Sequence, residues 1–379
     1  MSDAGDLRLR EWRPQPKIVL PVHEVDRARF PAIDAHNHLG RWVSAWLGDE
    51  PNAWTAPDVS ALLDLMDRCN LRAILNLDGR WGDDLEANLD RYDRAHPGRF
   101  ATMCHIDWAA AVASGDIGRS GAASLRDSIE GGARGVKVWK DLGLHVRDER
   151  GELIFPDDDR LRPIWDAAAE LEVPIFIHTA DPVAFFDPVD ERNERYEQLH
   201  AHPEWSFADP SFPRFGRLME ALEGLVAAHP ATTFVGLHAG CYPENLGWVG
   251  RMLDAYPNLH VDIAARVAEL GRQPRAARAL ITAHPDRVLF GIDEFPPDPA
   301  NYAIYFRFLE TEDEWFPHST EEPPEMGRWG IGGLGLPDDV LRKVYADNAL
   351  RIVPGLAIDA ADAPAHAPTS ARPSSGSNA

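Results

Sequence analysis

The chain has 379 residues, of which 44% are hydrophobic and 26% charged, the balance of a soluble globular protein. Its formal net charge of −23 disfavours nucleic acid and anionic membranes as partners, because both would be repelled. The three cysteines, Cys69, Cys104 and Cys241, have no paired spacing, and no run approaches 18 apolar residues. These features predict no disulfide framework, no membrane span and a cytoplasmic location.

Eight short β-rich runs alternate with stretches of helical periodicity. In chain order the runs cover residues 32–38, 71–79, 99–107, 135–141, 173–179, 232–240, 258–265 and 287–294. The stretches 58–70 and 161–173 have apolar residues at three and four spacing, with Asp58 and Asp159 at the expected N-cap positions. This alternation predicts a (β/α)8 TIM barrel. The rival, a doubly wound open sheet, would favour a glycine-rich turn after the first strand, and DAHNHLGRW is not one.

The chain divides by composition into three parts. We expect an N-terminal extension over residues 1–29, the barrel over 30–356 and a disordered, low-complexity tail over 357–379. Two connections are long: one follows the fifth strand, and the other, residues 295–335, follows the eighth. Both belong to the carboxyl-end face of the barrel, so they either cover a pocket there or form an oligomer contact.

Polar side chains stand at the ends of four predicted strands. His36 and His38 end the first strand, His178 the fifth, His238 the sixth and Asp293 the eighth. Because alternate residues of a strand share a face, these side chains can all point into the barrel. Neutral imidazoles and one carboxylate around an open position are typical of a catalytic site for zinc or a similar divalent ion. A single histidine is more often a surface or hydrogen-bonded residue, but the set predicts a metal site.

These motifs resemble the amidohydrolase superfamily, in particular the amidohydrolase-related branch that includes aminocarboxymuconate-semialdehyde decarboxylase. The matching segments are DAHNHLG, PIFIHT, FVGLHAG, VLFGIDEFPP and the closing VYADNALRIVPGL, and the resemblance covers residues 30–356. It implies one divalent metal, zinc with manganese as the alternative, held by His36, His38, His178 and Asp293. It also implies that His238 is the catalytic acid/base or stabilises the transition state, while Asp293 serves in catalysis as well as in metal binding.

Lysine is rare, since only four of the 38 basic residues are lysines, yet Lys137 and Lys140 both lie in GVKVWKDLG on the fourth strand. Lysine can form a carbamate or lose its charge, which arginine cannot do. Lys137 has three interpretations: a carbamylated ligand of a second metal, a group that binds a substrate carboxylate, or half of a buried ion pair. Lys140 has the opposite strand parity and is expected to be a solvated loop residue. Arg41, Arg80 and Arg266 follow strand ends and are candidates for holding an anionic substrate group, with surface ion pairs as the alternative.

The leading functional hypothesis is a metal-dependent hydrolase, in which a metal-activated water attacks the carbonyl carbon of an amide, ester or lactone. Asp293 would deprotonate the water, and His238 would stabilise the oxyanion or move the proton. The alternative is a metal-dependent non-oxidative decarboxylase of an aromatic or unsaturated carboxylic acid, which a cationic pocket would favour. A third hypothesis, a non-catalytic barrel, predicts a degraded metal site, whereas every ligand is present. We expect a small-molecule substrate, no nucleic-acid or membrane partner and, by the resemblance, a homodimer.

Overall fold

The computed structural model describes residues 4–15, 17–43 and 53–356, so the tail expected over 357–379 lies outside the described residues. Eight parallel strands follow one another in chain order, each within one of the predicted runs. They are β1 (Ala32–Asn37), β2 (Leu71–Asn76), β3 (Phe100–Thr102), β4 (Val136–Val138), β5 (Ile175–Ile177), β6 (Phe234–Gly236), β7 (Leu259–Asp262) and β8 (Val288–Leu289). The strands are shorter than the runs because the runs extend into the turns that carry the polar residues.

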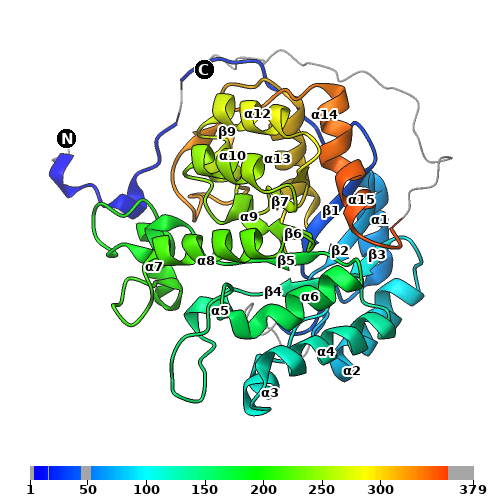
Figure 1. The fold of residues 1–379 in the computed structure, drawn as a ribbon. Coiled ribbons are helices and arrows are strands. Elements are labelled where there is room, and N and C mark those ends of the chain that lie inside the picture. The colour runs from blue at the N-terminus through cyan, green and yellow to red at the C-terminus, as the bar shows by residue number, and fades with distance from the viewer. Residues whose placement is uncertain (1–3, 16, 44–52, 357–379) are drawn as a thin grey trace.

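The strands close into a TIM barrel. One parallel ladder joins β1 to β3 and a second joins β4 to β8. Backbone hydrogen bonds bridge the ladders at both junctions: Lys137 N donates to Cys104 O over 2.7 Å between β3 and β4, and Asp293 N donates to His36 O over 2.8 Å between β8 and β1. The helices lie outside the strands (Figure 1).

The longer helices are α1 (Val59–Cys69), α2 (Gly82–Asn88), α4 (Ile117–Gly131), α6 (Arg162–Glu170), α8 (Phe215–Ala228), α10 (Leu246–Ala255), α12 (Pro274–Ala283) and α13 (Pro299–Glu310). Short helices are α3 (Trp108–Ala113), α5 (Asp141–Leu144), α7 (Tyr196–Ala201), α9 (Leu237–Gly240), α11 (Val267–Leu270), α14 (Asp338–Arg342) and α15 (Asn348–Ile352). Within the described residues, no helix is long and apolar enough to cross a bilayer.

The two predicted N-caps have different outcomes. Asp58 accepts hydrogen bonds from the backbone N–H groups of Ser60 and Ala61 and caps α1, as predicted. The prediction for Asp159 was wrong. Its neighbour Asp158 caps a short 3-10 turn by accepting from Arg160 N, and α6 begins only after that turn. A helical period alone does not reveal such a preceding turn.

Buried side chains form an inner and an outer core. Strand residues that include Ile33, Phe176, Val235 and Leu289 fill the barrel interior, and residues of the C-terminal helices pack on them. The outer core joins the strands to the surrounding helices and contains Val136 and Val138 of β4. Because side chains alternate along a strand, Lys137 between these two valines points into the barrel.

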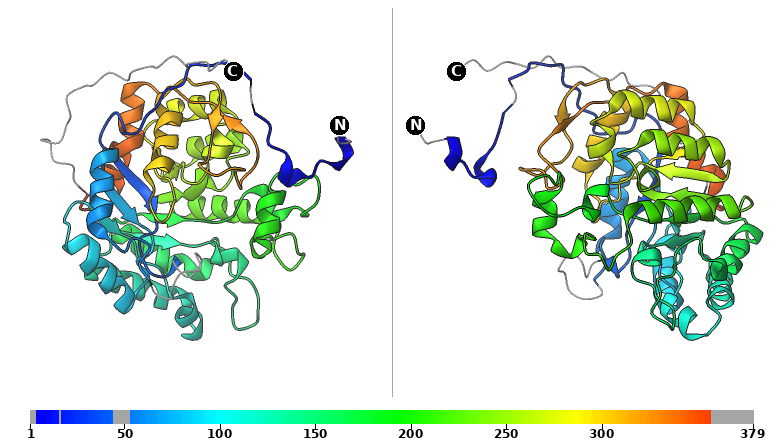
Figure 2. Two further views of the ribbon diagram at one scale, coloured as in Figure 1. Left: turned by 180° about the vertical axis from the view of Figure 1, so that it is seen from behind. Right: turned by 60° about the vertical axis from the view of Figure 1, so that its left-hand side comes forward.

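The two long segments meet over one end of the barrel (Figure 2). The segment after β5 contains α7, and the segment after β8 begins with α13 and then forms a short antiparallel pair, β9 (Phe316–Pro317) and β10 (Gly330–Ile331). Arg328 of the second segment pairs with Glu197 of the first at 2.6 Å, and Arg195 Nη1 donates to Met326 O over 3.0 Å. These contacts hold the segments side by side.

Candidate metal centre

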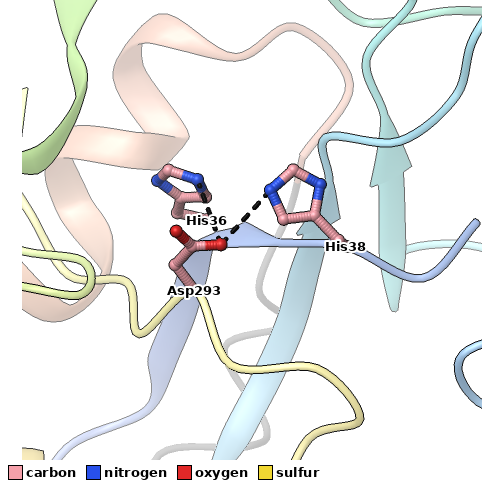
Figure 3. Close-up of side chains that lie close together, drawn as sticks. All are labelled: His36, His38 and Asp293. Carbon is pink, nitrogen blue, oxygen red and sulfur yellow. Dashed lines mark ion pairs between the residues drawn. The ribbon is translucent and has the colours of Figure 1, made fainter. Parts of the chain in front are cut away.

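Two imidazoles and one carboxylate converge at the carboxyl ends of β1 and β8. Asp293 Oδ1 lies 3.5 Å from His36 Nε2 and 3.2 Å from His38 Nε2 (Figure 3). Ligand atoms of these three residues all lie within 4.8 Å of one another. Both His36 Nε2 and Asp293 Oδ1 are buried and have no hydrogen-bond partner among the described residues. Since unpartnered buried polar atoms cost free energy, this donor set fits a divalent cation.

The backbone of β8 brings Asp293 to this place. Asp293 adopts a left-handed conformation with φ of 54°, which is uncommon for a residue with a side chain. Two residues earlier, Gly291 lets β8 approach β1 closely. A Cβ at position 291 would lie 2.9 Å from His36 Cβ and 3.0 Å from His36 N. The close approach of the two strands therefore depends on the missing side chain.

Asp262, at the end of β7, orients two of the histidines. Its Oδ2 lies 2.6 Å from His36 Nδ1, and its Oδ1 accepts from the backbone N–H of His238 over 2.5 Å. Donation from Nδ1 to a carboxylate leaves the His36 Nε2 lone pair free for a metal. Asp262 was not among the predicted site residues, although its position at a strand end was the same signal that identified the others.

His238 reaches the centre through a left-handed turn and not through strand alternation. Val235 and Leu237 are the interior residues of this region, so continued alternation would have turned residue 238 outward. The parity argument for His238 was therefore wrong. The backbone at His238 has φ of 58°, its Nδ1 lies 2.8 Å from Ala264 O, and its Nε2 lies 3.7 Å from Asp293 Oδ2. Donation from Nδ1 to Ala264 O leaves the Nε2 lone pair facing the carboxylate.

His178 lies beside this cluster but not within it. Its ring centroid is 4.4 Å from that of His238, and its Nε2 is 3.3 Å from Asp181 Oδ1. Asp181 also forms an ion pair with Lys140. Lys140 lies in the turn after β4, as expected, but its side chain is not freely solvated, because this ion pair holds it at the cavity, 25% exposed.

Burial determines most of the protonation states. It lowers the pKa of His38 to about 4 and that of His178 to about 3, so both are neutral at pH 7, the form that binds metals. Burial opposes ionisation of Asp293, but its electrostatic interaction with His36 holds the pKa of this carboxyl below its usual range. Burial lowers the pKa of Lys137 to about 8, which leaves its ammonium group largely protonated at pH 7.

A cavity of about 230 Å³ opens onto the cluster. Its apolar walls include Trp139, Phe185, Trp205, Phe295 and Met326. Phe185 and Trp205 belong to the segment after β5, and Phe295 and Met326 to the segment after β8. Both long segments thus line a pocket at the carboxyl end of the barrel, one of the two roles expected for them.

The four candidates for holding a substrate anion separate into two pairs. Lys137 and Arg266 line the cavity, and Arg41 and Arg80 do not. Arg41 donates to Asp84 over 2.8 Å, and Arg80 lines an adjoining cavity of about 510 Å³ that shares Lys137 and Trp139 with the first. The structure therefore brings only Lys137 and Arg266 to the candidate metal centre.

The amidohydrolase family model matches residues 84–355, which is more than two thirds of the chain. No curated protein sequence matches it. Among solved structures, 2,6-dihydroxybenzoate decarboxylase from Rhizobium is similar with a TM-score of 0.55 at 15% identity, over 85% of this chain and 98% of that chain. An uncharacterised TIM-barrel protein from Bordetella bronchiseptica gives 0.54 at 16% identity, over 85% and 97%. Dihydroxybenzoic acid decarboxylase from Polaromonas sp. JS666, with bound manganese and the inhibitor 2-nitroresorcinol, gives 0.54 at 14% identity, over 85% and 96%.

Likeness at these identities establishes the fold, and the family match establishes the membership. The chain belongs to the amidohydrolase family and is an enzyme of the metal-dependent amidohydrolase superfamily.

Proposed function

We propose that this enzyme is a metal-dependent, non-oxidative decarboxylase of a small aromatic or unsaturated carboxylic acid. The observation that carries the proposal is the side chain of Lys137. It is 1% exposed, faces the cavity beside Asp293, and its Nζ has no hydrogen-bond partner in the described part of the chain. A buried ammonium group without an anion is costly, so an anion supplied by the substrate fits this position.

The other two interpretations of Lys137 have less support. Within residues 4–15, 17–43 and 53–356, Lys137 forms no ion pair, which disfavours a purely structural role. Its Nζ lies 4.6 Å from the ring centre of Trp139, a contact that favours the charged ammonium form.

The cavity favours a small, flat substrate. Its volume of about 230 Å³ is below the roughly 300–1,000 Å³ of drug-sized ligand pockets. Trp139, Phe185 and Phe295 supply aromatic walls against which a ring or conjugated chain can stack. A single ring with its substituents suits this space.

His36, His38 and Asp293 would hold the divalent ion, and His178 is the proposed fourth ligand. Imidazole nitrogens and a carboxylate suit zinc, with manganese as the alternative. When bound, the ion supplies Lewis acidity toward an anionic oxygen of the substrate.

In decarboxylation the bond between the carboxyl carbon and the rest of the substrate breaks. CO2 leaves, the electron pair stays on the substrate carbon, and that carbon takes up one proton. We assign to Lys137 the stabilisation of negative charge that spreads over the substrate as CO2 leaves. His238 Nε2 and Asp293 Oδ2, 3.7 Å apart, form the pair that relays a proton from solvent to this carbon, since neither atom carries one in the resting site. The aromatic walls exclude water from it.

Hydrolysis of a small ester or lactone that carries a carboxylate is the second candidate. The free Nε2 lone pair of His238 beside Asp293 favours it, because this pair can also take a proton from a water molecule. The two candidates differ in whether CO2 leaves or water adds.

To test the proposal, the zinc-loaded protein is incubated in D2O with hydroxybenzoic acids, unsaturated carboxylic acids, lactones and esters. We expect CO2 in the headspace and one deuterium at the carbon that lost it, seen by NMR. Lys137→Met should lower kcat/KM by about 10²-fold, as removal of one charge-stabilising donor does, while metal content stays unchanged. Lys343→Met is the matched control, because Lys343 pairs with Asp286 at 2.9 Å outside the cavity.

Incorporation of 18O from water into an acid product, without CO2, would instead establish the hydrolase. Equal activity of Lys137→Met and Lys343→Met would remove Lys137 from either reaction.

A further inference from the structure

We propose that the substrate carries a second, non-reacting anionic group, a carboxylate, and that Arg266 binds it. The natural substrate class is then a small dicarboxylic acid. The inference rests on the proposed function for the identity of the reacting carboxylate, but its test measures binding alone.

Arg266 is a buried cation that the protein leaves without a counter-charge. It follows β7, lines the cavity and is 6% exposed. Its Nη1 donates to the backbone oxygen of Ala265 over 2.7 Å, and its Nε has no hydrogen-bond partner. No carboxylate in the described ranges forms an ion pair with it. The guanidinium group therefore has donors to offer a ligand.

The other cations that line the cavity are already neutralised. Arg195 forms a buried ion pair with Glu269, and Lys140 forms one with Asp181. The donor groups of Arg195 are further occupied, because its Nη1 also donates to Met326 O. Two cations of the cavity, Lys137 and Arg266, thus have no carboxylate partner in the part of the chain that the structure describes.

The net positive charge of the cavity favours a substrate with more than one anionic group. Asp293 is the remaining carboxylate among the described lining residues, and it belongs to the metal cluster. Together with Asp262, whose carboxylate contacts His36, and a divalent ion it forms a neutral centre, to which Lys137 and Arg266 add two positive charges. A monocarboxylate would leave one of these charges uncompensated in a buried site, whereas a dicarboxylate offsets both.

The positions of the two cations indicate how the anionic groups are spaced. Lys137 projects from β4 and Arg266 follows β7, so β5 and β6 lie between them around the barrel. We therefore expect carboxylates spaced as in a 1,3- or 1,4-diacid to meet both cations better than neighbouring 1,2-carboxylates.

The experiment titrates the zinc-loaded full chain with benzoate, phthalate, isophthalate and terephthalate in a carboxylate-free buffer, by calorimetry. We expect isophthalate or terephthalate to bind at least about tenfold more tightly than benzoate, the effect of one added charge-assisted contact. Arg266→Gln should remove this advantage and leave benzoate binding unchanged, and Arg266→Lys should restore part of it. Arg275→Gln, which removes the same charge from the exposed surface of α12, should keep it.

Equal binding of benzoate and both spaced diacids to the wild type would overturn the inference, as would no binding of any diacid at millimolar concentration. Both results are measured on the wild type, so they test the inference even if Arg266→Gln does not fold. A loss of affinity for benzoate and the diacids alike in Arg266→Gln would also count against a separate second site. If diacid preference is found but no CO2 is released, the decarboxylase proposal fails and this inference stands.

Discussion

The imidazole of His36 is fixed on both sides. Its Nδ1 lies 2.6 Å from Asp262 Oδ2, and its Nε2 points to Asp293 Oδ1. A carboxylate accepts but cannot donate a hydrogen bond, so Asp262 determines that the proton of His36 lies on Nδ1. The side that faces Asp293 is then the side with a lone pair.

Asp262→Asn tests this arrangement. The asparagine amide can place an N–H group against Nδ1, which favours the tautomer with the proton on Nε2 and so blocks the metal ligand. We expect zinc affinity to fall by about 10- to 100-fold, measured by competition with a chromophoric chelator. Asp254→Asn is the control, because Asp254 is 76% exposed and lies away from the cluster. Unchanged zinc affinity in Asp262→Asn would show that Asp262 does not set the tautomer.

At the scale of elements, the junction of β1 and β8 is the critical contact of the barrel. Asp293 N donates to His36 O, and Ala35 N donates to Phe290 O over 2.8 Å. Gly291 lies at this junction, where a Cβ would be about 3 Å from backbone and Cβ atoms of His36 that cannot rotate away. The junction that completes the barrel also sets the distance between two proposed ligands.

Gly291→Ala should therefore separate β8 from β1. We expect a loss of about 1–3 kcal/mol in the free energy of unfolding, as in other overpacked sites, together with reduced zinc content. Gly216→Ala, in α8, is the control, since a Cβ there meets nothing within 4 Å. Urea denaturation and metal analysis of both variants give the comparison, and identical curves for both would refute the steric argument.

The sequence predicted the strands of the barrel better than it predicted the backbone conformation and contacts of the residues that follow them. All eight strands could be predicted from alternation and order, and His36, His38 and Asp293 converge as expected. Alternation alone does not explain the position of the two histidines, because the interior residue Ile33 of β1 has the opposite parity and the ladder is irregular between Asp34 and Asn37. His238 could not be placed correctly by parity, because the left-handed turn after β6 interrupts alternation. The ion pair of Lys140 was missed for a related reason: its partner is 41 positions away, so this is a tertiary contact with no local signal.

At the scale of the whole molecule, buried histidines outside the metal cluster make the fold sensitive to acid. Burial lowers the pKa values of His105, His229, His260 and His318. The unfolded chain takes up these protons near pH 6.5, whereas the folded chain does not. Stability is therefore present above about pH 6.5 and is lost as the pH falls toward the lower folded values.

His260→Gln isolates one of these contributions. Burial, together with Arg287 and Arg351, lowers the pKa of His260 to about 3. Between pH 6.5 and 5 this residue should cost the native state about 1.5 kcal/mol, because the loss approaches about 1.4 kcal/mol per pH unit only below pH 6.5. Urea denaturation at the two pH values should show a smaller decline for His260→Gln than for the wild type. The control is His200→Gln, which changes an exposed histidine and should lose as much free energy of unfolding as the wild type. If His260 takes up no proton on unfolding, His260→Gln should also lose as much as the wild type.

The net charge of this protein repels an approaching anion, whereas the cations inside the cavity attract it. From a distance the molecule carries its formal charge of −23, whereas within the cavity Lys137 and Arg266 face the ligand. Salt screens the distant repulsion over about 10 Å at 0.1 M but acts much less on buried groups. Capture of an anionic substrate by this enzyme is therefore hindered at low ionic strength and becomes faster as salt is added, the reverse of an enzyme whose surface steers its substrate inward.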